Sequence, residues 1–336
     1  MDDYGERNIM LLQILLNVTG PIMVLIGIGA FLRRRFNLDV ATLSKLNIYF
    51  AVPAFIFTTI AYSKLNFAAM GGIVLTTVIQ TFLLGGLVFG LGRLLKVPHG
   101  VLASIALAVM FYNSANYGLP LAELAYPAED GRSGGAVQAF IVMTQNLLTF
   151  TVGLSIAASM KSGFAWNVVW RMLRLPMIPA LVAGLLAKWY LSLDPSHALP
   201  IIIAKPAQYV SASLVPLALA TLGAQLAQNP QWPRWKYVGP VLFLRLVYAP
   251  VQMIALLYLF SLMKIPALNL WPQTGWPAQL LILTAAVPTA VNTLLLTLEL
   301  EGDAKLAADC VFWTTVCSCL TIPFWIYGLW AYFGVH

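Results

Sequence analysis

Charged residues are scarce in this chain. Asp, Glu, Lys and Arg make up 9% of its 336 residues, whereas hydrophobic residues make up 60%. A soluble domain carries about a quarter of its residues charged, so this composition excludes one. Cysteine is also rare, and all three cysteines fall in one apolar stretch, at Cys310, Cys317 and Cys319. Such thiols pack in a helix or face lipid, and they imply neither a disulfide framework nor a metal site.

Catalytic patterns are scarce as well. The three histidines, His99, His197 and His336, lie far apart at the ends of apolar stretches. The sequence contains neither Gly-x-x-x-x-Gly-Lys nor His-Glu-x-x-His, the patterns of a phosphate loop and a zinc protease. An intramembrane enzyme would need a catalytic set at membrane depth. We therefore predict no enzyme, no metal and no cofactor.

Long apolar stretches are what the chain does have, and each is long enough to cross a bilayer as a helix of about 20 residues. They predict an all-α integral membrane protein that leaves no room for a separate soluble domain. The first residues are acidic where a signal peptide would be basic, so no cleaved signal is expected. The ten predicted spans are 9–32, 40–62, 69–92, 98–126, 134–159, 169–192, 200–227, 237–263, 276–299 and 303–332.

Positive charge is distributed unevenly between the predicted loops. The net charge of +7 gathers in alternate connections, which identifies their side as cytoplasmic and places both termini on the non-cytoplasmic side. Nucleic-acid binding is the competing interpretation of a basic chain, but no basic cluster lies in a soluble fold. The cations on the predicted cytoplasmic side are Arg33, Arg34, Arg35, Arg93, Lys96, Lys161, Arg171, Arg174, Arg234 and Lys236.

The fourth span contains a break. Residues 113–120 read Asn-Ser-Ala-Asn-Tyr-Gly-Leu-Pro within an otherwise apolar helix. Pro120 lacks an N–H and clashes with the preceding turn, so the helix must open there. Open backbone at membrane depth is tolerated only inside protein or beside a water-filled cavity. Such a break is the best sequence-level indication of a transporter's binding site.

The two halves of the chain repeat each other. Residues 52–61 and 215–224 both begin Val-Pro, and the threonine-rich run 144–149 has a counterpart at 314–319. Five spans per half is an odd number, so 1–160 and 161–336 would form an inverted repeat. The repeat predicts a second break in the ninth span, and Pro288 lies there, within 285–292.

These motifs resemble one known family. The run at 113–120 is similar to the fourth-helix motif of the auxin efflux carrier family, and so are the runs at 215–224, 288–292 and 307–318. The resemblance covers the whole chain, and its short loops resemble those of the bacterial members. It implies a fold like that of the sodium/bile-acid symporters, in which the broken helices 4 and 9 cross. Helices 1, 2, 6 and 7 would form a scaffold domain, and helices 3–5 and 8–10 a transport domain.

The same resemblance implies a function. Family members carry small organic anions, auxin in plants and dicarboxylates such as malonate or malate in some bacteria. We therefore expect a secondary transporter of the bacterial inner membrane that moves carboxylates outward by an elevator motion. An anion-binding sensor or channel on the same fold stays open as the alternative. The glycine pairs Gly27-x-Gly29 and Gly71-Gly72 would permit close helix packing in a homodimer.

The expected substrate site lies at the crossing of the two breaks, where half-helix N-termini attract an anion. Gly118, Pro120 and Pro288 would shape the breaks. The alternative is that Asn113, Asn116 and Asn292 only cap the broken helix ends and that Tyr117 only packs. Gln145 and Asn146 are adjacent in span 5, so we expect one of these side chains to face the cavity and the other to bind a neighbouring helix. The predicted substrate-binding residues are Asn113, Asn116, Tyr117, Gln145, Asn146 and Asn292.

Two charges, those of Arg245 and Asp309, lie inside the bilayer in the predicted topology. Arg245 and Asp309 are at similar depth by helix rise, so we expect them to pair, either structurally or as part of coupling. Glu123 follows Pro120 by three residues and would stabilise the start of the second half-helix, with proton transfer as the alternative. Span 3 carries no acid, unlike the plant relatives that the motifs resemble. The sequence therefore leaves the coupling ion open, along with the identity of the anion.

Overall fold

The computed structural model describes residues 2–129, 132–153, 155–156, 176–194, 196–227, 232–265, 268–270, 276–299 and 303–334. Within these residues the chain is helical, and it forms no sheet beyond two isolated β-bridges. Seven helices are long and apolar enough to span a membrane, and three shorter apolar helices accompany them. A helical, multi-pass membrane protein is thereby confirmed. Residues 157–175, with Lys161, Arg171 and Arg174, lie outside the described residues, as does His336.

The first half of the chain contains three long helices, a broken one and a fourth long one. The helices α2, α4 and α7 each continue from a preceding turn of π-helix without a gap. The bounds are α1 Asp2–Ile14, η1 Leu15–Thr19, α2 Gly20–Phe36, α3 Val40–Leu46, η2 Asn47–Ala51, α4 Val52–Ala61, α5 Phe67–Leu94, α6 His99–Met110, η3 Ser114–Gly118, α7 Leu119–Ala125, α8 Gly134–Leu148 and η4 Thr149–Gly153.

The second half follows the same order of long and broken helices. Its broken helix consists of two short pieces, α16 and α17, and its last helix, α18, is the longest in the described chain. The bounds are α11 Met177–Leu193, α12 Ile201–Ala212, α13 Leu214–Leu226, α14 Trp235–Phe243, η5 Leu244–Tyr248, α15 Ala249–Leu262, α16 Trp276–Ala285, α17 Val291–Glu299 and α18 Ala304–Phe333.

Proline explains four of the π-turns. Pro21, Pro53, Pro120 and Pro250 each stand two residues after the end of a π-turn, namely η1, η2, η3 and η5. A proline cannot donate to the carbonyl four residues back and its ring pushes that carbonyl away, so the preceding turn widens. Single π-turns often mark functional positions. Here they carry Asn47, Asn116 and Arg245, which all lie at the site described below.

Small residues bring α2 and α13 into close contact. A Cβ added to Gly29 would lie 2.0 Å from the Ala220 carbonyl oxygen, and one added to Gly223 would lie 1.9 Å from that of Ile26. Gly29 is therefore needed for the packing of α2 on α13 within the chain. Gly27 and Gly71 have no neighbouring atom within 4 Å, so a homodimer through them stays a prediction.

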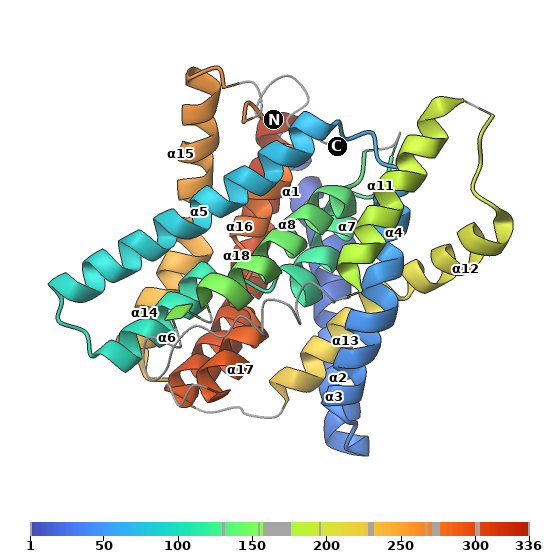
Figure 1. Cartoon of the computed structure of the whole chain (residues 1–336). Coiled ribbons are helices and arrows are strands. Elements are labelled where there is room, and N and C mark those ends of the chain that lie inside the picture. Colours follow the sequence, from blue (N-terminus) through green and yellow to red (C-terminus); the bar gives the residue numbers. More distant parts are fainter. Residues whose placement is uncertain are drawn as a thin grey trace.

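The helices separate into two groups (Figure 1). Helix α2 packs on α13, and α4 packs on α11 and α12, so spans from both halves of the chain interleave in one group. In the other group, α5 packs on α6 and α8, α15 on α16, and α18 on α14 and α17. The broken helices belong to this second group. The two ends of the chain lie at the same end of the molecule in Figure 1.

Candidate functional site

The two helix breaks touch each other, as the sequence predicts. Tyr112 and Thr289 form an isolated antiparallel β-bridge. The N–H of Asn113 donates to the carbonyl of Pro288 at 2.7 Å, and the N–H of Ala290 donates to that of Phe111 at 3.0 Å. Each break thus satisfies backbone groups that the other exposes, which is what open backbone at membrane depth requires.

Two side chains that the sequence argument did not single out strengthen this crossing. Thr289 donates its hydroxyl to the carbonyl of Ala108 at 2.8 Å. Gln138 of α8 is fully buried, donates to the carbonyl of Ser114 at 2.8 Å and accepts the hydroxyl of Thr284 at 2.7 Å. A single glutamine therefore joins both breaks. Its place in an otherwise apolar stretch of α8 is the signal that could have indicated it.

A cavity of about 240 Å³ opens at the crossing. It brings together five of the six predicted substrate-binding residues, and none of the described residues that line it is charged. Both half-helices that follow the breaks contribute their first residues. The lining residues are Ile48, Val52, Tyr112, Asn113, Ser114, Ala115, Asn116, Gln145, Asn146, Thr149, Phe150, Met177, Ala290, Val291 and Asn292.

Asn113 and Asn116 are held in different ways. Asn113 caps the half-helix that starts at η3, because its Oδ1 accepts the N–H of Asn116 at 3.2 Å. Its Nδ2 group is buried and has no hydrogen-bond partner among the described residues. Asn116 accepts a 2.6 Å hydrogen bond from Nδ2 of Asn47, a buried residue of η2 that the sequence argument missed. Asn113 therefore lines the cavity, caps the half-helix and keeps an amide N–H group that has no partner among the described residues.

Both members of the span-5 pair line the cavity, so the expectation that only one would face it is wrong. Each also has a neighbour on another helix: Gln145 donates to Thr81 of α5 at 3.0 Å, and Asn146 contacts the sulfur of Met177 at 3.5 Å. Adjacent residues on a helix point about 100° apart. Both residues nevertheless belong to the lining of the cavity.

Tyr117 does not line the cavity, which corrects its assignment as a cavity wall. Its side chain is 0% exposed, and its hydroxyl accepts a 3.2 Å hydrogen bond from Ser318.

Gly118 and Pro120 shape the first break. Gly118 allows the close approach of Gln138, since a Cβ at position 118 would lie 2.5 Å from Nε2 of Gln138. Pro120 is buried in the first turn of α7, which continues η3 without a gap, and the N–H it lacks accounts for the widened turn before it.

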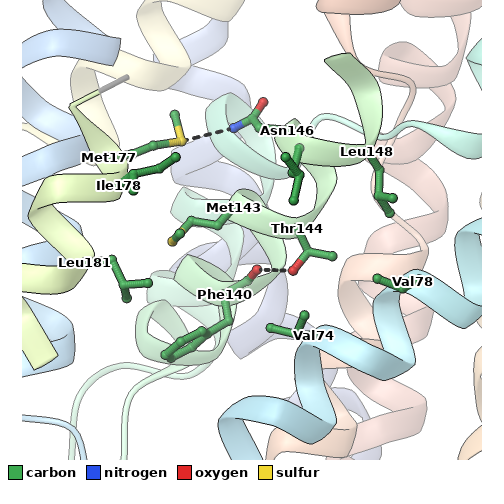
Figure 2. A pocket seen from close by; sticks show the side chains of 11 residues that line it. Val74, Val78, Phe140, Met143, Thr144, Asn146, Leu148, Met177, Ile178 and Leu181 are labelled. Carbon is green, nitrogen blue, oxygen red and sulfur yellow. Dashed lines mark hydrogen bonds between the residues drawn. The ribbon is translucent and has the colours of Figure 1, made fainter. Parts of the chain in front are cut away.

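An apolar pocket of about 400 Å³ lies beside the polar cavity, between α5, α8 and α11 (Figure 2). Val74, Phe140, Met143 and Leu181 are among the side chains that surround it. Asn146 and Met177 line both spaces, so they form the boundary between the polar and the apolar one.

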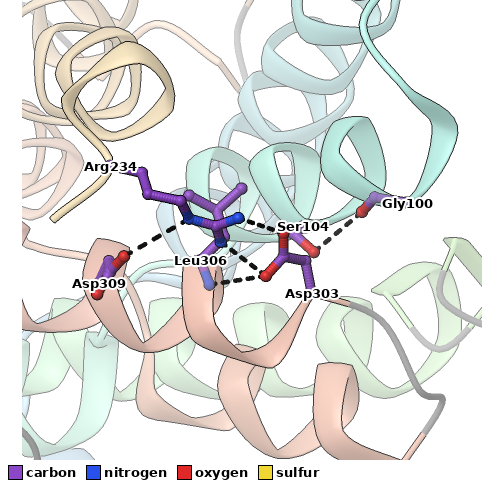
Figure 3. Close-up of polar contacts among 6 residues, drawn as sticks. All are labelled: Gly100, Ser104, Arg234, Asp303, Leu306 and Asp309. Atoms are coloured by element: carbon purple, nitrogen blue, oxygen red, sulfur yellow. Dashed lines mark hydrogen bonds and ion pairs between the residues drawn. The ribbon is translucent and has the colours of Figure 1, made fainter.

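The predicted ion pair between Arg245 and Asp309 is not formed. Arg245 donates to the backbone carbonyls of Val109, at 2.8 Å, and Ala285. Asp309 instead faces Arg234, with 3.9 Å between its Oδ2 and Nε of the arginine (Figure 3). Equal depth along two helices says nothing about their rotation, and the two side chains point to different neighbours.

Arg234 connects the starts of two helices. It donates two hydrogen bonds to the carboxylate of Asp303, at 2.8 and 2.7 Å, and Asp303 caps α18 through the N–H of Leu306 (Figure 3). The hydrogen bonds from Arg234 hold the pKa of the Asp303 carboxyl below its usual value.

The sequence predicted Glu123 at the start of its half-helix, and the structure shows that this is wrong. The half-helix begins at Ser114, because η3 runs directly into α7, and α7 ends at Ala125. The carboxylate is thus near the negative end of the dipole and cannot stabilise it there.

Residues 131–135 formally match Gly-x-Ser-x-Gly, the pattern around a nucleophilic serine in some hydrolases. The hydroxyl of Ser133 instead accepts a hydrogen bond from the N–H of Ala136 and so caps α8.

A helical membrane protein with two crossed, broken helices around a small polar cavity has the construction of a secondary transporter. Comparison with known proteins agrees, since residues 168–326 match the family model described as "Membrane transport protein". The second half of the chain is therefore similar to this family of membrane transporters.

Three relatives are named as transporters, and each alignment covers most of both chains. A putative malonate transporter of Rhizobium meliloti is 25% identical over 91% of this chain and 93% of its own. An uncharacterized transporter of Methanothermobacter thermautotrophicus is 24% identical, over 85% and 88%. Another, of Methanocaldococcus jannaschii, is 25% identical, over 84% and 87%.

Proposed function

We propose that the protein is a secondary transporter that binds small organic carboxylates in the crossover cavity. The observation that carries this proposal is the lining of the cavity, in which amide side chains and two half-helix N-termini meet and the described residues include no charged one. The half-helices from Ser114 and from Val291 both present their first residues there. Each N-terminus supplies about half a positive charge, and no carboxylate among the described lining residues opposes it.

Hydrogen-bond donors in the cavity suit a carboxylate as well. Side-chain amides of Asn113, Asn116 and Asn292 offer N–H groups beside the helix termini. A volume of about 240 Å³ is small, which favours compact acids over bulky ones. One relative is named as a putative malonate transporter, so malonate is the first substrate to test.

We further propose that the group containing the broken helices moves as a transport domain against a scaffold of α2, α4, α11, α12 and α13. Helices from both halves of the chain meet in each group, as an inverted repeat requires. The hydrogen bond between Asn47 and Asn116 joins the two groups at the cavity and would break during an elevator motion. Outward transport across the bacterial inner membrane is part of this proposal by family analogy.

Counterflow in proteoliposomes tests the transport function. Vesicles loaded with unlabelled malonate should accumulate labelled malonate, because only a carrier exchanges substrate across the membrane. A channel would give uptake without stimulation by internal malonate. A sensor would bind malonate without any uptake, and either result would reject the transporter in favour of these alternatives on the same fold.

Cross-linking tests the proposed motion, after the native cysteines have been replaced. Asn146→Cys with Met177→Cys joins α8 to α11 across the two groups, where the present side chains are 3.5 Å apart. Thr58→Cys with Ser211→Cys is the matched control, since these hydroxyls lie 3.0 Å apart within one group. Oxidation should stop transport by the variant with the first cysteine pair but not by the variant with the second. Reduction should restore transport by the first variant. Continued transport by the oxidised first pair would contradict the motion.

A further inference from the structure

Arg245 is the largest fully buried side chain in the described part of the protein. It extends from the π-turn η5 and, among the described residues, no carboxylate lies within 4.0 Å of it. A buried charge without a partner is costly in a membrane protein, so its surroundings must compensate for it. The compensation comes from the backbone of the two broken helices.

The two carbonyls that Arg245 binds occupy equivalent positions. Val109 lies in the last turn of α6, and Ala285 is the last residue of α16. These are the C-terminal ends of the half-helices that precede the two breaks. The break removes the N–H groups that would have bound such carbonyls, and the helix dipole leaves about half a negative charge at each end.

The charges balance at this point. Two half-helix ends supply about one negative charge, and the guanidinium supplies one positive charge. The ring of Tyr112, within the first break, adds a cation–π contact, with Cζ of Arg245 4.7 Å from the ring centroid. A bidentate guanidinium can reach both carbonyls at once, whereas a lysine ammonium is a single point charge.

In transporters with broken helices, unwound carbonyls and half-helix C-terminal ends are the usual ligands of the coupling cation. In this protein a side chain that stays protonated and cannot leave already occupies them. We propose that Arg245 is a positioning residue that serves as the built-in cation of the crossover. It holds both half-helix ends in place and makes substrate binding independent of Na⁺.

The transport readout of this inference rests on the proposed function, so the first test is counterflow of malonate with Na⁺ replaced by choline. The wild-type protein should transport at the same rate in both media, within about twofold. Transport that is about tenfold faster in Na⁺ would overturn the inference, because a second cation would then be required at or near the crossing.

Chemical rescue provides a test that does not depend on transport. In Arg245→Ala, free guanidinium at millimolar concentration should reoccupy the vacated position and raise the unfolding temperature, with no anion present. The same addition should not stabilise the wild type or the control Arg234→Ala, whose arginine binds Asp303 outside the crossing. An Arg245→Ala protein that transports like the wild type, or that gains nothing specific from guanidinium, would overturn the inference.

Arg245→Lys keeps the inference testable if the alanine variant does not fold. An ammonium cannot bind both carbonyls, so malonate binding should weaken about tenfold. Arg245→Lys with unchanged malonate binding would contradict the bidentate role. If the wild type transports no carboxylate at all, the proposed function fails, while the guanidinium rescue still decides the role of Arg245.

Discussion

The two helix breaks face each other, yet they are built differently. The first unwinds over Phe111–Asn113 and then forms a π-turn, and it contributes Asn113, Ser114 and Asn116 to the cavity. The second is a short extended link whose Pro288 and Thr289 bind the first break, and from its side only Asn292 offers a polar side chain to the cavity. The two breaks therefore share the crossing but differ in what they contribute to it. The first break provides most of the polar groups at the cavity, and the second braces the first.

Inserting a negative charge into the first break should have the largest effect. Asn113→Asp keeps the size of the side chain but places a carboxylate where we expect the substrate carboxylate to bind. Malonate counterflow should fall by at least about tenfold, which corresponds to about 1.4 kcal/mol of lost affinity. Asn292→Asp, in the half-exposed position of the second break, should lose less. An equal loss in both variants would contradict this difference between the two breaks.

Filling the space beside the first break should destabilise the protein. Gly118→Ala places a Cβ against Gln138, and the glutamine joins both breaks, so we expect about 1–3 kcal/mol of lost stability in a denaturation experiment in detergent. Gly86→Ala in α5 is the matched control, because a Cβ there has nothing within 4 Å. A Gly118→Ala protein as stable as the control would show that Gln138 moves aside freely.

Weakening the second break should affect stability rather than binding. Thr289→Val removes the hydroxyl that bonds Ala108 while keeping the shape of the side chain. Hydrogen bonds between membrane helices contribute about 0.6 kcal/mol on average, so a loss of that size is expected in thermal unfolding. The apparent malonate affinity should stay within about twofold. A large loss of affinity with normal stability would make Thr289 a ligand group.

The link between Arg234 and Asp303 anchors α18, which packs against the second break through Thr314. Because its folded pKa is lowered, Asp303 adds stability above its ordinary pKa of about 3.9, and this is lost as pH falls through the lower, folded value. For a partly exposed pair the contribution is about 0.5–1 kcal/mol. Asp303→Asn should flatten the decrease in unfolding temperature below about pH 4. An unchanged pH profile would show that the pair contributes nothing.

Removing the Tyr117 hydroxyl should have the smallest effect. The residue lies within the first break by sequence, but its side chain packs away from the cavity and its hydroxyl accepts a bond only from Ser318 among the described residues. Tyr117→Phe should therefore transport malonate within about twofold of the wild type, as measured by initial counterflow rates. A tenfold loss would restore Tyr117 to the substrate site.

The breaks were predictable because Asn, Gly and Pro have few other reasons to stand together inside an apolar span, and their contact was implied by the family resemblance. Three of the amide residues at the cavity, Asn113, Asn116 and Asn292, lie in the breaks, whereas Gln145 and Asn146 were predicted from the resemblance. The repeat pointed to Pro288 by position alone. The residue types alone therefore predicted the positions at which the helix backbone is interrupted.

Side-chain partners across helices were not predictable from one sequence. Depth along the chain matched Arg245 to Asp309, but helix rotation directs the arginine to Val109 and Ala285. Glu123 was misplaced because the π-turn η3 starts the half-helix earlier than Pro120 suggests. Asn47 and Gln138 looked like isolated polar residues in apolar spans. Their roles depend on which helix lies opposite, which only the packed structure shows.

The central claim is that the crossover cavity binds a small carboxylate, and titration calorimetry of the purified protein with malonate tests it most directly. The account predicts a binding isotherm for the wild type and for Tyr117→Phe, and its loss in Asn113→Asp. Should malonate fail, the same titration applies to other mono- and dicarboxylates. Binding that is indifferent to the charge at position 113, or no binding of any carboxylate, would contradict the claim.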